Sequence, residues 1–502
     1  MMKILSVESI READKYTILN EPIASVDLME RAANQCMHWL NDHYDIFTEL
    51  TFFCGLGNNG GDGLAIARMW YEIGSKSKVF IVNHSKNHSV DFDINLKRLQ
   101  ETVVPITFVD SVSAITGIFE NEIIIDSILG SGLNSPANGL IAEVIDFINS
   151  LKNKKIAIDL PSGLFADKSN KPEDAIINAD ITLCFELPKL AFFFPQNYKV
   201  AGNWIILPIQ LSADFIKSAK TDNYYITKEF VMRIYKPRNK FAHKGNYGHS
   251  LIAAGSQGKM GAAVLAAKAC LRAGVGLLTI HCPKVGLNIL QTSIPEAMVE
   301  HDIDDRCISC IHHLEKYDVI GIGPGIGQDI KTHQALQELL VNFKNPMVID
   351  ADALNILSEH KTWMQYVPEN SILTPHFKEF ERLTHKVEND FDRNRLQREF
   401  SIRHKVYIVL KGANTAITTP QGDCFFNTTG NPGMATGGSG DVLTGFLVSL
   451  LSQGYSSFDA SILGVFLHGL AGDIFAGKNS EESLIASDLA ENIGWAIKEI
   501  SS

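Results

Sequence analysis

The sequence predicts an α/β protein of two doubly wound domains, each with a mostly parallel sheet covered by helices on both faces. Strongly apolar β-type runs alternate with amphipathic helical runs through most of the chain, as they do in such sheets. A more polar segment interrupts this alternation near residues 212–225. The chain has 502 residues, which is too long for one hydrophobic core. We therefore expect one domain over residues 1–215 and a second over residues 225–502.

The individual elements follow from the period of the apolar residues. In the first half we expect strands over residues 50–56, 78–83, 121–128 and 154–163, with helices over residues 63–74 and 140–151. The second half restarts with a strand, a helix and a strand over residues 248–256, 261–274 and 276–283. Further strands are expected over residues 317–325, 346–354, 371–376 and 406–412.

Charge and hydropathy exclude some classes of protein. The formal net charge is -12 and no long run of Lys or Arg occurs, which disfavours nucleic acid or an anionic membrane as the main partner. The apolar run at the N-terminus is too short for a secretory signal, and no uninterrupted apolar stretch has the length of a membrane span. We expect a soluble, cytoplasmic protein.

The eight cysteines are scattered and lie mostly in apolar segments, which is typical of buried free thiols in a reducing compartment. Cys307 and Cys310 have C-x-x-C spacing, with His312 and His313 just after them. A zinc site needs a second pair of ligands at a matching spacing. No such pair follows, so the sequence disfavours a zinc or redox site here.

The stretch CGLGNNGGDGLAIAR, residues 54–68, contains a G-x-G-x-x-G pattern between an expected strand and an expected helix. A dinucleotide redox cofactor would also require an acidic residue at the end of the second strand. That strand ends in KVFIVN and is followed by HSKNHS, so the hydride-transfer interpretation is disfavoured. Glycines next to a helix N-terminus suit phosphate, and Asn58, Asn59 and Asp62 add oxygens for a cation. The alternative is a tight strand–helix turn with satisfied Asn side chains.

Two further strand ends of the first half carry polar residues. Asp126 ends one strand before a turn through residues 130–132, and Asp159 ends another before Ser162. Because ligands of doubly wound sheets bind at the carboxyl ends of the strands, the three strand ends are expected to converge on one crevice. Asp126 by itself is also compatible with a helix cap or a turn.

The strongest signal of the second half is NPGMATGGSGDVLTG, residues 431–445. Its glycines lead into an apolar helix, so their backbone N–H groups would form an anion cradle at the helix N-terminus. Such a cradle can stabilise a phosphoryl group in transfer. Asp441, at its mouth, could take a proton from an attacking hydroxyl or could simply cap the helix.

Other strand ends of the second half agree with a phosphate site. Lys411 and Thr415 lie where nucleotide phosphates would bind, and Gly325 would bring the backbone close to a ligand. Glu379 could reach a water bound to magnesium. His376 precedes it; a lone histidine is more often a satisfied polar residue than a catalyst, and only these neighbours favour a role for it.

Several motifs of the first half together resemble the NAD(P)H-hydrate epimerase domain: LMERAA at residues 28–33, NNGGDGLAIAR, DSILGSG, DLPSG and ELPKLAFFFP at residues 186–195. The resemblance implies a Rossmann-like domain that interconverts the R and S forms of the hydrated nicotinamide ring at C6. It implies that Asp159 lies at the reacting ring and that Asn59, Asp126 and Ser162 hold a potassium ion. Lys189 is either a second participant or a surface lysine. The damaged dinucleotide would be bound by Asn58, Asn59, Gly60, Gly61, Asp62, Gly130, Ser131, Gly132, Leu133, Asn134, Ser135, Pro136 and Asp159.

The second half resembles the ribokinase-like NAD(P)H-hydrate dehydratase domain. GSQGKMGAAVLAA, IGPGIG, VIDADALN, LTPHFKEFERL, KGANT and NPGMATGGSGD occur in that family's order over residues 225–500. The resemblance implies that Gly325, His376 and Asp441 contact the hydrated dinucleotide, with Asp441 catalytic. The phosphate donor would be bound by Lys411, Gly412, Ala413, Asn414, Thr415, Gly437, Gly438, Ser439 and Gly440.

Together, the two resemblances imply a bifunctional enzyme that repairs hydrated nicotinamide cofactors. It would epimerise NADHX and NADPHX and dehydrate their S forms with ADP and Mg²⁺, giving AMP and phosphate. Its partners would be these small molecules, without nucleic acid or membrane, and a homo-oligomer is expected. Two alternatives stay open: a small-molecule kinase of the ribokinase class, and a non-catalytic NAD(P)-sensing module fused to a kinase-like domain.

Overall fold

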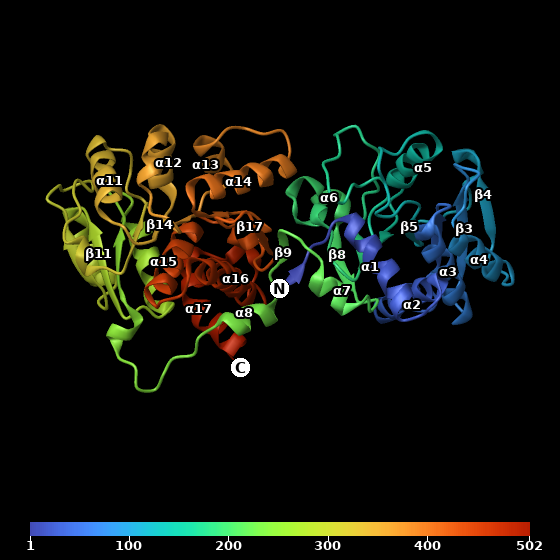
Figure 1. Cartoon of the computed structure of the whole chain (residues 1–502), viewed down its shortest axis with the longest axis horizontal. Helices are drawn as coiled ribbons and strands as arrows, with labels where there is room; N and C mark the ends of the chain where they lie inside the picture. Colours follow the sequence, from blue (N-terminus) through green and yellow to red (C-terminus); the bar gives the residue numbers. More distant parts are fainter. Residues whose placement is uncertain (502) are drawn as a thin grey trace. The chain divides into compact units, whose positions relative to one another are not determined.

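The computed structural model describes residues 1–501. The chain divides into two compact units: an N-terminal unit of Lys3–Thr221 with Asn389–Phe391, and a C-terminal unit of Met1–Met2, Asp222–Glu388 and Asp392–Ser502. Both are mixed α/β structures, as the alternation of apolar runs predicts (Figure 1).

The N-terminal unit contains a seven-stranded sheet in the order β4-β3-β2-β5-β6-β7-β8. All its neighbouring strands are parallel, and the central strands are buried on both faces, which explains their continuous apolar sequences. The strands are β2 (Leu50–Cys54), β3 (Ser77–Val82), β4 (Ile106–Val109), β5 (Ile123–Ser127), β6 (Lys155–Ile158), β7 (Ile181–Phe185) and β8 (Asn203–Leu207).

Helices cover both faces of this sheet. Phe52 and Ile125 pack on one face with α2, α3 and α4, whereas Phe53 and Ile124 pack on the other with α5. The helices are α1 (Val7–Asn20), α2 (Ser25–His43), α3 (Asn58–Glu72), α4 (Val90–Gln100), α5 (Gly139–Ser150), α6 (Tyr198–Ala201) and α7 (Ala213–Ser218). The strand order reverses between β2 and β5, which is where a doubly wound sheet opens a crevice at the carboxyl ends of its strands.

The C-terminal unit contains an eleven-stranded sheet in the order β1-β9-β18-β17-β16-β15-β14-β13-β10-β11-β12. It is parallel from β12 to β16, but β17 pairs antiparallel with both β16 and β18. The strands are β1 (Met2–Lys3), β9 (Asn223–Tyr225), β10 (His249–Ala253), β11 (Leu277–Cys282), β12 (Met298–His301), β13 (Val319–Ile322), β14 (Met347–Ile349), β15 (Ile372–Leu373), β16 (Tyr407–Leu410), β17 (Thr415–Thr418) and β18 (Cys424–Asn427).

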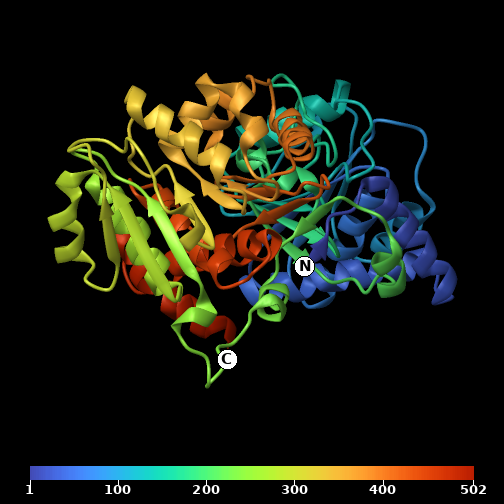
Figure 2. The ribbon, with the colours of Figure 1, turned by 60° about the vertical axis from the view of Figure 1, so that its left-hand side comes forward.

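Two layers of helices cover this sheet as well (Figure 2). Ile252 packs with α9, α15, α16 and α17, and its neighbour Leu251 packs on the opposite face with α11, α12 and α13. The helices are α8 (Lys228–Ile234), α9 (Met260–Arg272), α10 (Leu287–Ser293), α11 (Ile330–Asn342), α12 (Ala351–Glu359), α13 (Phe377–Leu383), α14 (Asp390–His404), α15 (Ser439–Ser452), α16 (Ser457–Ala476) and α17 (Ala486–Ser501).

Helix α16 is long and apolar enough to cross a membrane by length and composition, but 67% of its apolar window is buried inside the protein. That burial is typical of a core helix of a globular unit.

All eight cysteines are free, and only Cys310 is more than marginally exposed, as expected for buried thiols.

Both glycine-rich motifs differ from the expected loops in one respect, because their helices begin inside the motif. Helix α3 begins at Asn58 and α15 at Ser439, so residues 58–62 form the first turn of a helix. A Cβ atom on Gly60 would lie 1.9 Å from the carbonyl oxygen of Gly55. Glycine therefore allows the helix to start immediately after the strand.

Helix α15 also approaches α9 through a glycine. A Cβ atom on Gly445 would lie 1.9 Å from the carbonyl oxygen of Ala266, and backbone atoms of a helix cannot move away cheaply. On α17, by contrast, a Cβ atom on Gly494 would meet nothing within 4 Å.

We expect Gly445→Ala to destabilise the C-terminal unit by about 1–3 kcal/mol, because the methyl group overpacks the contact between α9 and α15. Gly494→Ala is the matched control and is expected to stabilise the same unit by about 0.5–1 kcal/mol, since alanine favours a helix interior. Urea-induced unfolding of the full chain, followed by circular dichroism, measures both. Equal midpoints for the two variants would contradict this account of the contact.

Candidate active sites

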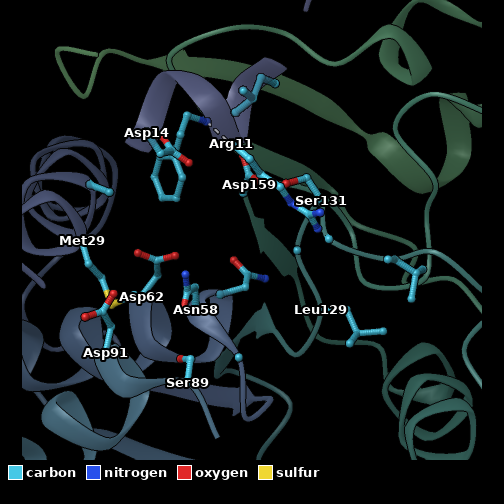
Figure 3. Close-up of a pocket in the computed structure, with 18 of the residues that line it drawn as sticks. Arg11, Asp14, Met29, Asn58, Asp62, Ser89, Asp91, Leu129, Ser131 and Asp159 are labelled. Carbon is cyan, nitrogen blue, oxygen red and sulfur yellow. Dashed lines mark hydrogen bonds between the residues drawn. The ribbon is translucent and has the colours of Figure 1, made fainter. Parts of the chain in front are cut away.

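The N-terminal unit has a cavity of about 860 Å³ at the crevice between β2 and β5 (Figure 3). The turn into α3, the segment after β5 and the end of β6 all contribute to its lining, so the three strand ends do converge. The sequence-predicted residues that line it are Asn58, Asn59, Asp62, Gly130, Ser131, Gly132, Leu133, Asn134, Ser135 and Asp159. Gly60, Gly61 and Pro136 are not among the lining residues.

Asp159 follows β6 in a left-handed backbone conformation, with φ of 64°. Such a conformation costs a non-glycine residue about 1–3 kcal/mol and is often kept at functional sites. Its carboxylate oxygen Oδ1 lies 2.8 Å from the ammonium nitrogen of Lys189. The turn therefore fixes a carboxylate at the cavity and pairs it with a cation.

Lys189 is not a surface residue, because its side chain is only 1% exposed. Burial by itself lowers the pKa of Lys189, but the Asp159 carboxylate and the Cys184 thiol outweigh burial and raise it. The ammonium group also lies 3.3 Å from the carbonyl oxygens of Phe185 and Leu187. Lys189 is thus held as a charged group facing Asp159.

The cavity is strongly acidic. Burial raises the pKa of Asp62 well above its usual range, and Asp159, Asp14 and Asp91 raise it further. Burial also raises the pKa of Asp14 to about 6, with Asp159 adding to the shift and Lys189 opposing it. Such shifts near a cavity are typical of functional sites. Asp14 and Asp62 are therefore protonated more readily than an exposed carboxylate.

Asp126, near the end of β5, and Ser162, in the segment that follows β6, lie together and are both buried. The hydroxyl of Ser162 donates to Asp126 Oδ1 at 2.5 Å and its backbone N–H donates to Oδ2 at 2.7 Å. Burial raises the pKa of Asp126 to about 6, and the hydrogen bonds from Ser162 limit that rise. The pair presents carboxylate and hydroxyl oxygens at one point.

Asn59 completes the predicted set of potassium ligands. Its side chain is buried, and neither its amide oxygen nor its amide nitrogen has a hydrogen-bond partner within residues 1–501. A buried amide without a partner costs free energy unless a ligand satisfies it. Amide, carboxylate and hydroxyl oxygens are the donors that a hard cation prefers, so the residues present fit a potassium ion.

The C-terminal unit has a groove of about 340 Å³ at the carboxyl ends of β10, β13 and β14. The reversal of strand order between β10 and β13 lies beneath it. Gly325 and Asp441 both line this groove, together with Glu379. Its other lining residues were not predicted as site residues: Gly258, Lys259, Gly261, Ala262, Ala351, Asp352 and Asn355.

Asp441 lies in the first turn of α15, beside a buried network of charges. Burial raises the pKa of Asp441 to about 6, and Asp350 raises it further whereas Lys411 lowers it. The Lys411 ammonium donates to Asp350 Oδ1 at 2.8 Å, and the Thr444 hydroxyl donates to Oδ2 at 2.8 Å. A carboxyl group with a raised pKa is suited to accept a proton near neutral pH.

The glycines before α15 lie against this network. A Cβ atom on Gly440 would be 3.1 Å from the Lys411 ammonium, and Gly438 has φ of 94°. The ring Nε2 of His468 lies 3.1 Å from the carbonyl oxygen of Ser439. Burial lowers the pKa of His468 to about 4, so its neutral ring donates this hydrogen bond and supports the helix start. The N-terminus of α15 thus lies beside a lysine ammonium, and both favour an anion.

The other predicted residues of this unit have local structural partners. His376 caps α13, since its Nδ1 accepts hydrogen bonds from the N–H groups of Lys378 and Glu379. It adjoins Lys411 through a parallel bridge, although it does not line the groove. Thr415 donates its hydroxyl to the carbonyl oxygen of Gly412 at 3.0 Å. Residues 411–415 therefore form a tight turn between β16 and β17.

Sequence reasoning missed two groups of residues. Asp14 and Arg11 on α1 line the first cavity, but an amphipathic helix gave no motif to point at them. Asp350 and Asp352 lie in VIDADALN, in the second half of the strand expected over residues 346–354. Asp126 and Asp159 were predicted as site residues from similar positions near the ends of their expected strands. Ala351 between them has φ of 49°, a second unusual backbone conformation at a site.

Comparisons with known proteins agree with the two-unit organisation. Residues 25–191 match the family described as YjeF-related protein N-terminus, and residues 250–494 match the family described as NAD(P)H-hydrate dehydratase. The bifunctional NAD(P)H-hydrate repair enzyme Nnr of Moorella thermoacetica is 32% identical over 516 residues, covering 99% of this chain and 97% of its own. The enzyme of the same name from Escherichia coli is 32% identical over 465 residues, covering 92% and 88%.

Among solved structures, the chain is similar to the ADP/ATP-dependent NAD(P)H-hydrate dehydratase of Bacillus subtilis, co-crystallised with ATP/Mg²⁺. The sequences are 30% identical, the match covers 55% of this chain and 98% of the other, and the TM-score is 0.49.

The raised pKa of Asp441 predicts a pH-dependent gain in stability for Asp441→Asn. The folded state bears the cost of the buried charge above pH 6, whereas below the unfolded pKa of 3.8 both states are protonated. We expect the variant and the parent chain to be equally stable near pH 4, and the variant to be more stable by about 1–3 kcal/mol at pH 7.

Urea unfolding at a series of pH values measures this difference. The exposed Asp305→Asn is the control, which should change stability by less than about 0.5 kcal/mol at every pH. If Asp441→Asn were less stable than the parent chain at pH 7, the predicted free-energy cost of burying the Asp441 charge would be contradicted.

Proposed function

This chain belongs to the family of bifunctional NAD(P)H-hydrate repair enzymes, and we propose how its two units divide the reaction. The N-terminal unit interconverts the R and S hydrates, and the C-terminal unit dehydrates the S hydrate with ADP, giving AMP and phosphate. The proposal depends most on one observation: a carboxyl group lies at the crevice of each sheet, Asp159 in one unit and Asp441 in the other. Two separate acid–base sites suit two separate reactions.

In the N-terminal unit, Asp159 is the group that exchanges a proton with the hydrated ring at C6. Its carboxylate is held in place by the ion pair with the buried Lys189. Residues 58–62 and 130–136 bind the dinucleotide, with the N–H groups at the start of α3 directed toward its phosphates. Asn59, Asp126 and Ser162 would hold a potassium ion. When bound, that ion would supply a fixed positive charge beside an otherwise acidic cavity.

In the C-terminal unit, Asp441 accepts the proton of the C6 hydroxyl as its oxygen attacks the terminal phosphorus of the nucleotide. The N–H groups of residues 437–440 and the Lys411 ammonium stabilise the charge of the transferred phosphoryl group. Phosphate then leaves C6 with its electron pair as C5 loses a proton, which restores the ring double bond. Mg²⁺ accompanies the nucleotide and supplies charge neutralisation of its phosphates.

The first test uses absorbance at the reduced nicotinamide band. The full chain is incubated with mixed R and S hydrates, K⁺, Mg²⁺ and either ADP or ATP. Complete recovery of reduced cofactor with release of phosphate supports both activities and identifies the donor. Recovery of only the S fraction would remove epimerisation from the N-terminal unit. A stable phosphorylated product in place of free phosphate would favour a small-molecule kinase.

The two activities should be separable by mutation. We expect Asp441→Ala to lower dehydration at least about 100-fold and leave epimerisation unchanged, because general base catalysis contributes about 100-fold or more. Asp159→Ala should do the reverse. Epimerisation is measured by the R/S ratio without nucleotide, and dehydration by absorbance with pure S hydrate. Loss of both activities in a folded single variant would contradict the division, and loss of neither would favour a sensing module.

Potassium should affect epimerisation through Asn59. We expect replacement of K⁺ by Li⁺ to slow epimerisation by the parent chain about 10-fold or more, because the smaller ion suits the site's geometry less well. Asn59→Ala should be slow in K⁺ and should no longer distinguish the two ions. A variant that keeps the parent's K⁺ dependence would remove Asn59 from the ligand set.

The expectations of a cytoplasmic location and of a homo-oligomer remain predictions. Sedimentation of the full chain measures the second directly.

A further inference from the structure

Helix α1 forms one wall of the cavity in the N-terminal unit, although it lies before the matched family region of residues 25–191. Ile10, Arg11, Asp14 and Ile18 all line the cavity from this helix. The helix is held by specific contacts: the backbone N–H of Val7 donates to Asp167 Oδ2 at 2.7 Å. Asp14 is thus fixed at the cavity by ordered structure.

Asp14 differs from Asp159 in its partners. Asp159 is paired with the Lys189 ammonium, whereas the Asp14 carboxyl makes no hydrogen bond or ion pair with the side chains and backbone of residues 1–501. Figure 3 shows Asp14 on α1 and Asp159 at the end of β6, both directed toward the same cavity. Burial, followed by the charge of Asp159, raises the pKa of Asp14 to about 6.

Asp14 and Asp159 thus line one cavity in different electrostatic surroundings, since only Asp159 is paired with a cation. Carboxyl groups in such different surroundings are suited to divide the roles of acid and base. We propose that Asp14 is the second catalytic residue of epimerisation, the acid that acts on the hydrated ring opposite the base Asp159. This inference rests on the proposed function of the N-terminal unit and adds a residue to its mechanism.

Inversion at C6 requires both an acid and a base because C6 carries a hydroxyl group and is bonded to the ring nitrogen N1. Asp159 takes the hydroxyl proton, the C6–O bond becomes a carbonyl, and the C6–N1 bond breaks with its electron pair passing to N1. The Asp14 carboxylic acid protonates N1. After the open aldehyde turns its other face toward N1, the reverse transfers close the ring, and both residues return to their starting states.

Other groups of the cavity are less suited to this task. Asp62 is almost fully buried at the start of α3, and Asp91 accepts a hydrogen bond from the Ser25 hydroxyl at 2.5 Å. Asp159 raises the pKa of Asp14 and Lys189 lowers it. The other charged and titratable groups that line the same cavity are Arg11, Asp62, His84, His88 and Asp91.

The test is Asp14→Asn in the full chain, with the rate of epimerisation and the rate of dehydration of S hydrate measured on the same preparation. We expect kcat for epimerisation to fall about 100-fold or more, in the range lost when a general acid is removed. KM should change by less than about 3-fold, because the amide keeps the size of the carboxyl group. Dehydration should be unchanged, which also reports that the chain is folded.

The pH profile gives a second readout. An acid works only while it is protonated, so kcat of the parent chain should fall as the pH rises above the pKa of Asp14. This basic limb should be absent in Asp14→Asn. Asp14→Glu keeps the carboxyl group and should retain more activity than the amide. Glu12→Gln, at an exposed position on the same helix that does not line the cavity, should match the parent.

Three outcomes would overturn the proposal: kcat within about 3-fold of the parent in Asp14→Asn, an effect on KM alone, or an unchanged basic limb. If Asp14→Asn fails to fold, an Asp14→Glu variant that folds but shows no activity above the Asp159→Ala level would also overturn it. Failure of the proposed function itself looks different, because the parent chain would then show no R-to-S conversion at all.

Discussion

Parallel strand pairing is the constraint on which both sites depend. It places the carboxyl ends of neighbouring strands at one edge, so Asp126 and Ser162, far apart in the chain, are joined by hydrogen bonds, and Asn59 and Asp159 line the same cavity. Where the strand order reverses, the helices of adjacent strands leave toward opposite faces and the edge opens. The same arrangement in the C-terminal unit assembles Gly325, Asp352 and Asp441 around its groove. In both units, the order and direction of the strands therefore decide where the proposed catalytic residues lie.

The two sites place their charges differently on this shared frame. In the N-terminal unit the buried ammonium of Lys189 pairs with Asp159, and further carboxyl groups, among them Asp14 and Asp62, line the same cavity. In the C-terminal unit the Lys411 ammonium lies beside the start of α15 and donates a hydrogen bond to Asp350, so a positive charge and a helix N-terminus lie together where we propose that phosphate is transferred. The difference in chemistry between the units corresponds to this difference in electrostatics.

The alternation of apolar runs was sufficient to predict the α/β class and the buried central strands, because strands covered on both faces have a distinctive composition. It did not predict the antiparallel pairing of β17. The spacing of apolar residues predicts that a segment is a strand, but it does not predict the direction in which that strand pairs with its neighbours. The motif residues Asn58, Asp62 and Asp441 were found because glycines mark the starts of their helices.

Residues that act through tertiary contacts were harder to predict. Lys189 was left undecided between the site and the surface because its partner lies 30 positions earlier in the chain. Asp14 was missed because an acidic residue on an amphipathic helix usually faces solvent. In both residues the informative quantity is burial next to a charge, which exists only once the chain has folded. The roles of the predicted site residues remain for experiment.

The wall formed by α1 has a consequence for what counts as the smallest working piece of this protein. The cavity is closed on one side by residues 10–18 and on another by Ile209 and Leu211, and the hydroxyl of Thr17 accepts a hydrogen bond from the backbone of Ser212 at 2.9 Å. The motifs of the N-terminal unit, from residue 28 to residue 195, all lie between these two ends. A fragment trimmed to these motifs would keep the sequence signature of the unit but lose two walls of its cavity. The smallest fragment with a complete cavity therefore has to include α1 and residues 209–212.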